Sequence, residues 1–276
     1  MPTIAYLGPE GTNTHLAALK HFGASAKYLH APTVDDVFHA VERRQVEYGV
    51  VPIENSLEGA VTHTLDRFID FVDTPVNIQG EIEQPIRHCL ILHRGVALSA
   101  VEEVYSHPQA LAQCHRWLAQ HLRQVRRLET NSTADAVSLV ARDGTHRWRA
   151  AIGRKELAGA YGLKTVAIPE ERENKTRFLV IGLKEPARRK RNKTSIVFAL
   201  KDRPGALYDA LTPFKREGIN LTKIESRPSK KKAWQYYFFI DLEGHVMEPK
   251  VKKALRALAA STSLLRVLGS YPATAR

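Results

Sequence analysis

The sequence predicts an α/β protein with two lobes, followed by a smaller α+β module. Through the first 184 residues, short apolar runs that end in polar residues alternate with segments of helical periodicity. This pattern is typical of strand–helix units with a parallel sheet core. After residue 193 the order becomes strand, helix, strand, strand, helix, strand, the split βαββαβ arrangement of ferredoxin-like folds. We therefore expect domains at 1–184 and 194–272, joined by a basic linker at 185–193.

The elements of the first domain follow from apolar runs, helical periodicity and capping residues. Apolar runs predict strands at 3–7, 26–29, 48–56, 76–92 (two strands crossing between the lobes), 104–106, 150–153, 165–168 and 179–182. Apolar residues at helical spacing predict helices at 16–22, 34–43, 60–69, 109–122 and 155–161, with a further capped helix starting within 130–136. Thr33 and Ser106 precede two of these helices and are expected to act as N-caps.

The second domain is justified in the same way. Strands are predicted at 194–200, 219–227, 234–242 and 263–269, and helices at 204–217 and 249–260. A turn at Lys230–Lys232 is expected to join the two middle strands.

Length and composition agree with a globular protein that has more than one domain. The chain has 276 residues, of which 43% are hydrophobic and 25% are charged, so it can bury a sizeable core. We expect no signal peptide and no membrane span, because no apolar window approaches the ~18 residues that a span needs. The two cysteines form no CxxC pair, and the histidines show no metal-ligand spacing. We expect a cytoplasmic protein without a metal.

The formal net charge of +12 has two explanations. A basic chain can bind nucleic acid, or its charges can be solvated. Much of the excess lies in Lys184–Lys193 and Lys230–Lys232, without a helix-turn-helix, zinc-finger or RNP-like pattern beside either run. We favour solvated charge, which would also attract a small dianion, over the alternative of a nucleic-acid-associated regulator.

Polar side chains cluster where predicted strands end. Glu54, Asn55 and Ser56 end one strand, and Ser106 ends another. In open α/β sheets, ligands bind at the carboxyl ends of strands, although Asn55 and Ser56 could also only cap a turn. After the first strand, Gly11 and Thr12 precede a helix, whose free N–H groups and positive end can receive an anion.

A second group of polar residues lies where a loop becomes a strand. Glu173 to Phe178 supplies the amide of Asn174, the hydroxyl of Thr176 and the guanidinium of Arg177. Because side chains alternate along a strand, Thr176 and Phe178 should share one face and Arg177 should take the other. The alternative is an ordinary strand start with a surface arginine.

Several motifs, in this order and at these separations, resemble prephenate dehydratase, the enzyme of phenylalanine biosynthesis. They are GPEGTNTH, VVPIENSLEG, SHPQALAQC, NSTADA and ENKTRF, and the resemblance covers residues 3–183. RPGAL and IESRP resemble an ACT domain, the amino-acid-sensing module that follows the catalytic part in this family. The resemblance implies a periplasmic-binding-protein-like catalytic domain, with one lobe at about 1–78 and 160–184 and the other at about 79–159.

The resemblance also implies an activity and a site. Prephenate would lose CO2 and its ring hydroxyl to give phenylpyruvate, without a cofactor. The hydroxyl of Thr176 would donate a hydrogen bond to the departing oxygen. Catalytic residues would be Thr176, Glu54, Asn55, Gln113 and Ser106. Substrate-binding residues would be Gly11, Thr12, Ser56, Asn174, Arg177 and Phe178.

Regulation is the last implication. L-phenylalanine would bind between ACT modules of paired subunits in a homodimer or homotetramer, with its carboxylate at a helix start. The effector site would comprise Gly205, Ala206, Leu207, Asn220, Glu225, Ser226, Arg227 and Pro228. We expect a monofunctional enzyme, because no helical mutase segment precedes Thr3. Arogenate dehydratase activity and a non-catalytic amino-acid-sensing protein remain the alternatives.

Overall fold

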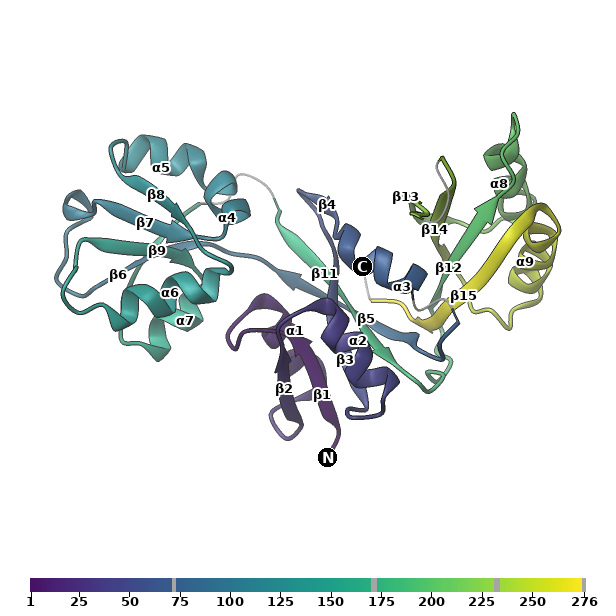
Figure 1. Ribbon diagram of the computed structural model, residues 1–276, viewed down its shortest axis with the longest axis horizontal. Coiled ribbons are helices and arrows are strands. Elements are labelled where there is room, and N and C mark those ends of the chain that lie inside the picture. The colour runs from purple at the N-terminus through teal and green to yellow at the C-terminus, as the bar shows by residue number, and fades with distance from the viewer. Residues whose placement is uncertain (71–72, 170–172, 231–233, 275–276) are drawn as a thin grey trace. The chain divides into compact units, whose positions relative to one another are not determined.

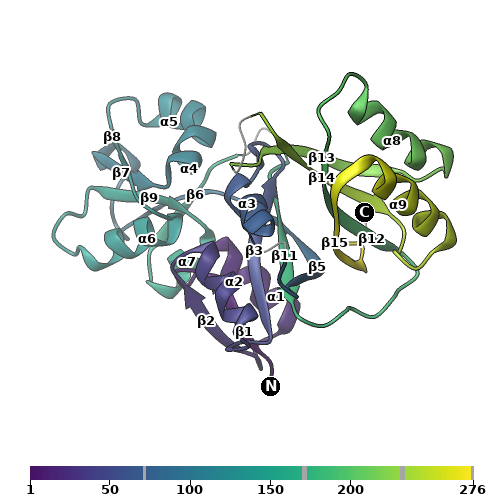
Figure 2. The ribbon, with the colours of Figure 1, turned by 45° about the vertical axis from the view of Figure 1, so that its right-hand side comes forward.

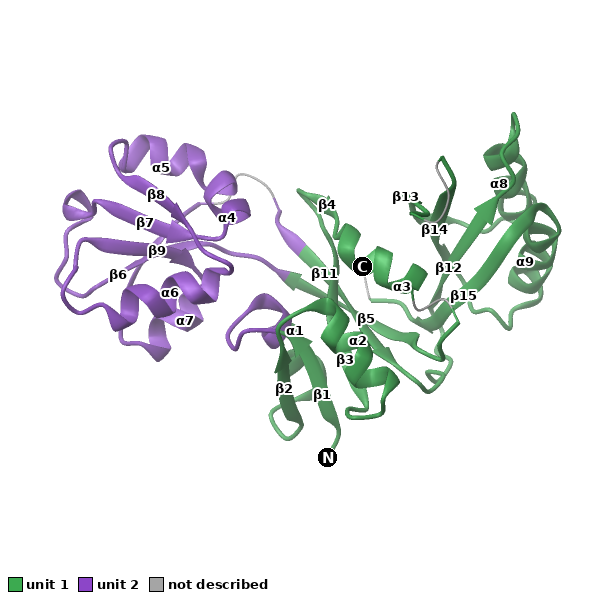
Figure 3. Ribbon diagram, in the orientation of Figure 1, with its two compact units in different colours: residues 1–7, 17–84, 176–276 green, residues 8–16, 85–175 purple. Residues whose placement is uncertain are grey.

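A computed structural model describes residues 1–70, 73–169, 173–230 and 234–274, and the chain divides into two compact units (Figures 1 and 3). Unit 1 comprises residues 1–7, 17–84 and 176–276, and unit 2 comprises residues 8–16 and 85–175. The division differs from the predicted lobes at residues 8–16 and 160–175, which lie in unit 2, and at residues 79–84, which lie in unit 1. Residues 160–175 belong to unit 2 because strand β10 (Lys164–Ala167) pairs antiparallel with β6 (Cys89–Leu92).

The N-terminal sheet of unit 1 has the strand order β2-β1-β3-β11-β5, and the short β4 pairs with β3. Its strands are β1 (Thr3–Leu7), β2 (Lys27–Ala31), β3 (Tyr48–Asn55), β4 (Gly59–Ala60), β5 (Asn77–Pro85) and β11 (Lys175–Gly182). Its helices are α1 (Asn13–Phe22), α2 (Val34–Glu42) and α3 (Thr62–Asp70). β1 runs parallel to β2 and β3, but β11 is antiparallel to β3, so the predicted parallel core is only partly correct.

Alternation along β11 separates two cores on the two faces of this sheet. Leu179 and Ile181 belong to a core that includes Phe38 of α2 and Phe68 of α3. Phe178 and Val180 belong to a different core, to which α1 contributes alanines. Each large apolar side chain buried in this way contributes about 1.5–3 kcal/mol. Helix α2 begins at the predicted N-cap, Thr33, whose side chain and Asp36 form a capping box.

Unit 2 contains a five-stranded sheet with the strand order β10-β6-β9-β7-β8. Its further strands are β7 (Glu103–Ser106), β8 (Arg126–Glu129) and β9 (Arg149–Gly153), and its helices are η1 (Leu98–Ala100), α4 (Pro108–Gln113), α5 (His115–His121), α6 (Thr133–Arg142) and α7 (Lys155–Ala160). Again β7 is parallel to β8 and β9, while β6 is antiparallel to β9. The helix predicted at 109–122 is interrupted at Cys114.

The C-terminal module belongs to unit 1 and confirms the predicted βαββαβ order. Its elements are β12 (Asn192–Leu200), α8 (Ala206–Arg216), β13 (Leu221–Pro228), β14 (Tyr236–Glu243), α9 (Pro249–Ser261) and β15 (Thr262–Pro272), and the sheet order is β13-β14-β12-β15. The predicted turn at Lys230–Lys232 extends outside the described residues, of which Lys230 is the last before the gap. Because β12 starts at Asn192, the linker ends two residues earlier than the predicted range of 185–193.

The module's sheet has apolar contacts on both faces. Helices α8 and α9 cover one face (Figure 2), where Phe198, Phe214 and Leu258 are buried. Side chains of the other face, such as Phe239 and Tyr271, share a core with α2, α3 and β5. The module therefore packs as an integral part of unit 1.

Gly269 of β15 lies where this shared core leaves no room for a side chain. A Cβ atom at this position would lie 2.3 Å from the carbonyl oxygen of Ile78 in β5. We predict that Gly269→Ala lowers the free energy of unfolding by roughly 1–3 kcal/mol, because the backbone of β5 or β15 must move. Urea denaturation measures the change. The control is Gly159→Ala in α7, where a Cβ meets nothing within 4 Å. That variant should be neutral or slightly stabilising, and equal losses in both variants would contradict the explanation.

Candidate functional site

The ends of β3 and β11 bring together the two predicted residues Asn55 and Thr176. They are register partners, and Asn55 Nδ2 donates a hydrogen bond of 3.0 Å to Thr176 Oγ1. Asn55 Oδ1 accepts from the backbone N–H of Leu57 and Glu58, at 2.9 and 3.2 Å. This turn fixes the amide orientation of Asn55. Because the Thr176 oxygen accepts from Asn55, the hydroxyl proton of Thr176 points away from Asn55 Nδ2.

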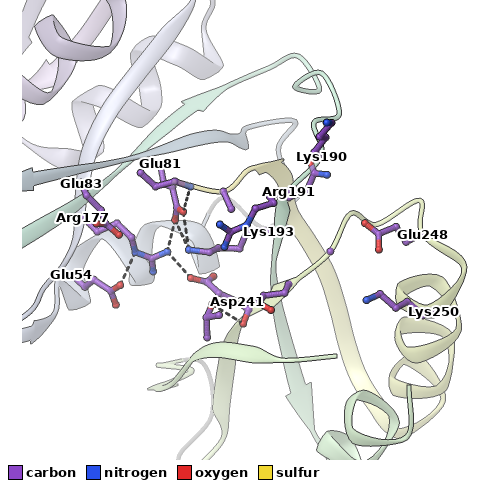
Figure 4. Close-up of a pocket in the computed structure, with 16 residues that line it drawn as sticks. Glu54, Glu81, Glu83, Arg177, Lys190, Arg191, Lys193, Asp241, Glu248 and Lys250 are labelled. Carbon is purple, nitrogen blue, oxygen red and sulfur yellow. Dashed lines mark hydrogen bonds and ion pairs between the residues drawn. The ribbon is translucent and has the colours of Figure 1, made fainter. Parts of the chain in front are cut away.

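The neighbouring register pair, Arg177 and Glu54, faces the C-terminal module (Figure 4). Arg177 lies on the face opposite Phe178, as predicted. Its Nε lies 2.6 Å from Glu54 Oε1, and its Nη1 lies 3.0 Å from Glu81 Oε2 and 2.7 Å from Asp241 Oδ2. Asp241 belongs to β14. The guanidinium predicted to bind substrate is therefore surrounded by three carboxylates of the protein.

Electrostatics keep this network charged. Burial lowers the pKa of Arg177, but the Asp241 carboxylate and its other acidic neighbours raise it well above the usual value. Burial raises the pKa of Glu54, but Arg177 and Lys223 lower it by more, so the net pKa lies below the usual value. The Lys223 ammonium contacts Glu54 directly. Glu54, predicted as a catalytic group, is thus held as a carboxylate within two ion pairs.

Basic residues of the C-terminal part neutralise carboxylates of the N-terminal sheet and its helices. Lys193 Nζ lies 2.6 Å from Glu81, and Lys230 Nζ lies 2.6 Å from Asp66 of α3. These two lysines come from the basic runs that we expected to be solvated. The Lys193 side chain is only 14% exposed and compensates Glu81, which corrects the expectation for this residue. The Lys230 side chain is 66% exposed, as expected, and its ammonium also compensates Asp66, which is 9% exposed.

Phe178 and Ser56, predicted to bind substrate, lie in different environments. The Phe178 side chain is 1% exposed in the core with Tyr6 and Val50, so it supports the sheet. Ser56 directly follows β3 and is exposed.

In unit 2, the predicted residues Gln113 and Asn174 meet, together with a residue that sequence reasoning missed. Gln113 Oε1 accepts from Asn174 Nδ2 at 2.9 Å and lies 3.0 Å from His88 Nε2. His88 is 6% exposed and precedes β6. Both donors on one oxygen fix the orientation of the Gln113 amide. The sequence pattern gave little indication that His88 belongs to the site, because a lone histidine next to a strand has no characteristic spacing to other polar residues.

Ser106 does not act as the predicted N-cap. Its buried hydroxyl donates to the carbonyl of Ile152 at 2.7 Å, and α4 is instead capped by His107, whose Nδ1 accepts from Gln109 N. The reason is that Ser106 is the last residue of β7, between β8 and β9, so its side chain ties adjacent strands.

The predicted anion corner around Gly11 is partly occupied by the protein itself. The Gly11 N–H donates to His15 Nδ1 at 3.1 Å, and Thr12 Oγ1 accepts from His15 N at 3.3 Å. Burial lowers the pKa of His15, which agrees with a neutral ring that accepts a hydrogen bond. Sequence reasoning missed Arg154, which is 5% exposed and donates to the Gly11 carbonyl at 3.2 Å. Its Nε has no hydrogen-bond partner within the described part of the chain.

The predicted effector residues do not all converge within one chain. Ala206 and Leu207 line a cavity of about 530 Å³ at the start of α8. The Ala206 N–H already donates to Arg203 O, which leaves fewer helix-start donors than expected. Pro228 lies at the Tyr236 end of β14, whereas Leu221, next to Asn220, pairs with Leu242 at the other end. Arg227 binds Asp66 of α3 through two hydrogen bonds, of 2.8 and 3.1 Å.

Residues 1–70, 73–169, 173–230 and 234–274 contain no candidate metal site and no candidate membrane span. No three His, Cys, Asp or Glu side chains are grouped closely enough to hold an ion. Every described helix is too short or too polar to cross a bilayer.

Comparisons with known proteins agree over nearly the whole chain. Residues 4–186 match the family model described as prephenate dehydratase, and residues 194–260 match that of the ACT domain. A bifunctional chorismate mutase/prephenate dehydratase of Aquifex aeolicus is 49% identical over 271 residues, which cover 98% of this chain and 73% of that protein. A prephenate dehydratase of Methanocaldococcus jannaschii is 41% identical, with coverage of 98% and 97%.

A solved structure is similar as well. The crystal structure of prephenate dehydratase from Arthrobacter aurescens in complex with L-Phe aligns with a TM-score of 0.88 and 34% identity. The alignment covers 98% of this chain and 89% of that chain.

Glu81 makes the stability of this site depend on pH. Burial raises its pKa, but Lys193, Arg177 and the Thr274 N–H lower it from 4.5 to about 2. The folded protein therefore gains stability from ionised Glu81 above pH 4.5 and loses it as the pH falls toward 2. We predict that Glu81→Gln removes on the order of 2 kcal/mol from the difference in unfolding free energy between pH 6 and pH 3, which is the part of the pH dependence that falls in this range. Urea denaturation at pH 6 and pH 3 measures this. Glu83→Gln, two residues along β5, is the control, and an unchanged pH dependence in Glu81→Gln would contradict the assignment.

Proposed function

Because this chain belongs to the prephenate dehydratase family, we propose that it converts prephenate to phenylpyruvate in the cytoplasm, under feedback control by phenylalanine. The predicted family and the predicted ACT module are both confirmed by the family models. The roles of individual residues in the reaction are our proposal, and they follow from the contacts described above.

The chemistry needs one well-placed proton donor and cations for a dianion. The C–C bond to the ring carboxylate breaks and releases CO2, and its electron pair enters the ring as the C–O bond to the ring hydroxyl breaks. The departing oxygen receives a hydrogen bond as the C–O bond breaks, takes up one proton from solvent, and leaves as water. Aromatisation of the ring drives the reaction, so no electron sink is required. A hydrogen bond that strengthens as the oxygen departs lowers the barrier.

The hydrogen bond from Asn55 to Thr176 carries this proposal. Because Asn55 donates to Thr176 Oγ1, the hydroxyl proton of Thr176 is left to donate to the departing oxygen. Threonine is a poor acid, so Thr176 acts by donating a hydrogen bond. Asn174 precedes Thr176 by two residues, so the backbone keeps it within about 7 Å, and its amide is already oriented by Gln113.

Arg154 is the cation that we assign to a substrate carboxylate. Arg177 is surrounded by three protein carboxylates, so binding substrate would require it to give up a partner. Arg154 is buried and offers an Nε without a partner in the described residues, and a guanidinium suits a carboxylate well. Glu54 and Arg177 then support Asn55 and Thr176 from the adjacent positions. Thr12, Ser56 and Ser106 stay predictions.

Thr176 supplies the test of this mechanism. We predict that Thr176→Ala lowers kcat at least about a hundredfold, because the departing oxygen loses its donor. Thr176→Ser should retain more activity, because it keeps the hydroxyl. Phenylpyruvate absorbance measures turnover, and circular dichroism checks that each variant folds. Turnover at the wild-type rate in Thr176→Ala would exclude the hydroxyl from the mechanism. Absence of turnover in the wild-type chain would favour a non-catalytic amino-acid-sensing protein.

Arogenate is the alternative substrate, because it differs from prephenate only by an amino group in place of the keto group. Parallel assays of both compounds, with and without phenylalanine, decide between them. A higher kcat/KM for arogenate would replace prephenate in the proposal.

The cavity at the start of α8 supports phenylalanine binding by the module. Apolar and aromatic side chains line it, namely Leu200, Ala206, Leu207, Trp234, Tyr236 and Phe238. Several large apolar side chains of the module are exposed: Leu207, Tyr208, Ile224, Trp234 and Tyr236. Such a surface is typical of a protein contact. We therefore keep the proposal that modules of paired subunits enclose phenylalanine, in a homodimer or homotetramer.

Ala206 provides a test of the effector site. We predict that Ala206→Leu weakens phenylalanine binding at least about tenfold, because the larger side chain fills the cavity. Calorimetry measures the binding, and turnover without phenylalanine should be unchanged. Ala260→Leu, at an exposed position of α9, is the matched control. Normal phenylalanine binding in Ala206→Leu would place the effector elsewhere.

A further inference from the structure

Two cross-strand pairs of charges meet where the C-terminal module contacts the strands of the candidate site. In the N-terminal sheet, Arg177 of β11 pairs in register with Glu54 of β3. In the module's sheet, Asp241 of β14 pairs in register with Lys223 of β13. The two pairs contact each other with opposite signs, Arg177 to Asp241 at 2.7 Å and Glu54 to Lys223 directly. We call these four residues the charge clasp.

The clasp is largely withdrawn from water. The side chains of Arg177, Asp241 and Lys223 are 8%, 9% and 11% exposed, and that of Glu54 is 32% exposed. Asp241 is fixed further by Ser195, whose hydroxyl donates to Oδ1 at 2.6 Å. Ion pairs that are withdrawn from water impose a defined geometry, because an unpaired buried charge is costly. A displacement of Asp241 or Lys223 must therefore be followed by Arg177 or Glu54.

The clasp is joined directly to the residues that carry the chemistry. Arg177 follows Thr176 in β11, and Glu54 precedes Asn55 in β3, so both members of the Asn55–Thr176 hydrogen bond are covalent neighbours of the clasp. Immediately beyond, the register shifts between Arg177 and Phe178. A bulge at this point interrupts the regular ladder and bends the strand, so it re-aims the side chains at the strand end.

On the module side, the clasp is joined to the predicted effector strand. Lys223, Glu225 and Arg227 alternate along β13 and share one face. Lys223 contacts Glu54, and Arg227 binds Asp66 of α3. The side chains between them, Ile224 and Ser226, are exposed on the other face. β13 thus contacts the rest of unit 1 through cations at two points.

We propose that Lys223 and Asp241 are positioning residues for the Asn55–Thr176 pair, and that the charge clasp transmits the binding of phenylalanine to it. This proposal rests on the proposed function. Phenylalanine at the module shifts β13 and β14, the clasp moves Glu54 and Arg177, and the Thr176 hydroxyl leaves the geometry that it needs. The size of the response is set by the difference in contacts between the two states.

The test is the double variant Lys223→Met with Asp241→Asn. It removes one cation and one anion together, so the remaining partners Arg177, Glu54, Glu81 and Lys193 stay balanced in charge. We expect calorimetry to give a phenylalanine Kd within about threefold of wild type, while the inhibition of turnover falls to less than about a third of its wild-type fold-change. Inhibition of wild-type size in the double variant would overturn the proposal, and so would loss of phenylalanine binding.

Controls separate the clasp from general effects on the module. Lys253→Met removes an ammonium of α9 that lies 2.7 Å from Glu217 within the same module, and it should leave inhibition unchanged. Lys223→Arg in the otherwise wild-type chain keeps the positive charge, so it should retain inhibition by phenylalanine. If the double variant does not fold, Lys223→Gln alone is measured in the same way and should also lose inhibition.

Hydrogen exchange gives a readout that does not need turnover. Phenylalanine should change amide exchange at residues 175–182 in the wild type but not in the double variant. Equal changes in both proteins would overturn the clasp. Absence of prephenate turnover in the wild type, with the expected exchange result, would overturn only the proposed function.

Discussion

Burial of the Arg177 guanidinium among the carboxylates of Glu54, Glu81 and Asp241 is the constraint on which the site depends. A cation in this position must stay paired, so β3, β5, β11 and the module have to meet in one arrangement. That arrangement sets the register in which Asn55 faces Thr176. The chemistry that we propose for the Thr176 hydroxyl therefore rests on electrostatics one residue away from it.

Much of the fold could be predicted, because local patterns determine it. The N-cap at Thr33 and the βαββαβ order of the module depend on neighbouring residues and were confirmed. Antiparallel pairing of β11 with β3 could not be predicted, because periodicity indicates a strand but not its partner. The assignment of residues 160–175 to unit 2 likewise depends on a pairing between β10 and β6, which are distant in sequence.

The sequence indicated which residues to consider for the candidate site better than it indicated how those residues contact one another. Asn55 with Thr176, and Gln113 with Asn174, were named from motifs and lie in hydrogen-bond contact. Arg177 was named as a substrate-binding residue, with the direction that it faces left open. Its partner Asp241 is 64 positions away, and no local pattern relates the two. His88 and Arg154 were missed for the same reason, since each acquires its role only from distant partners.

The apolar core shared by α2, α3, β5 and the inner face of the module limits how regulation can work. Phe68, Ile78, Phe239 and Tyr271 are buried together, and full undocking of the module would return all of them to water. An effector that binds with ordinary affinity cannot supply that much free energy. In the regulation that we propose, the signal therefore passes by small sliding adjustments of a continuous interior, not by detachment of a tethered domain.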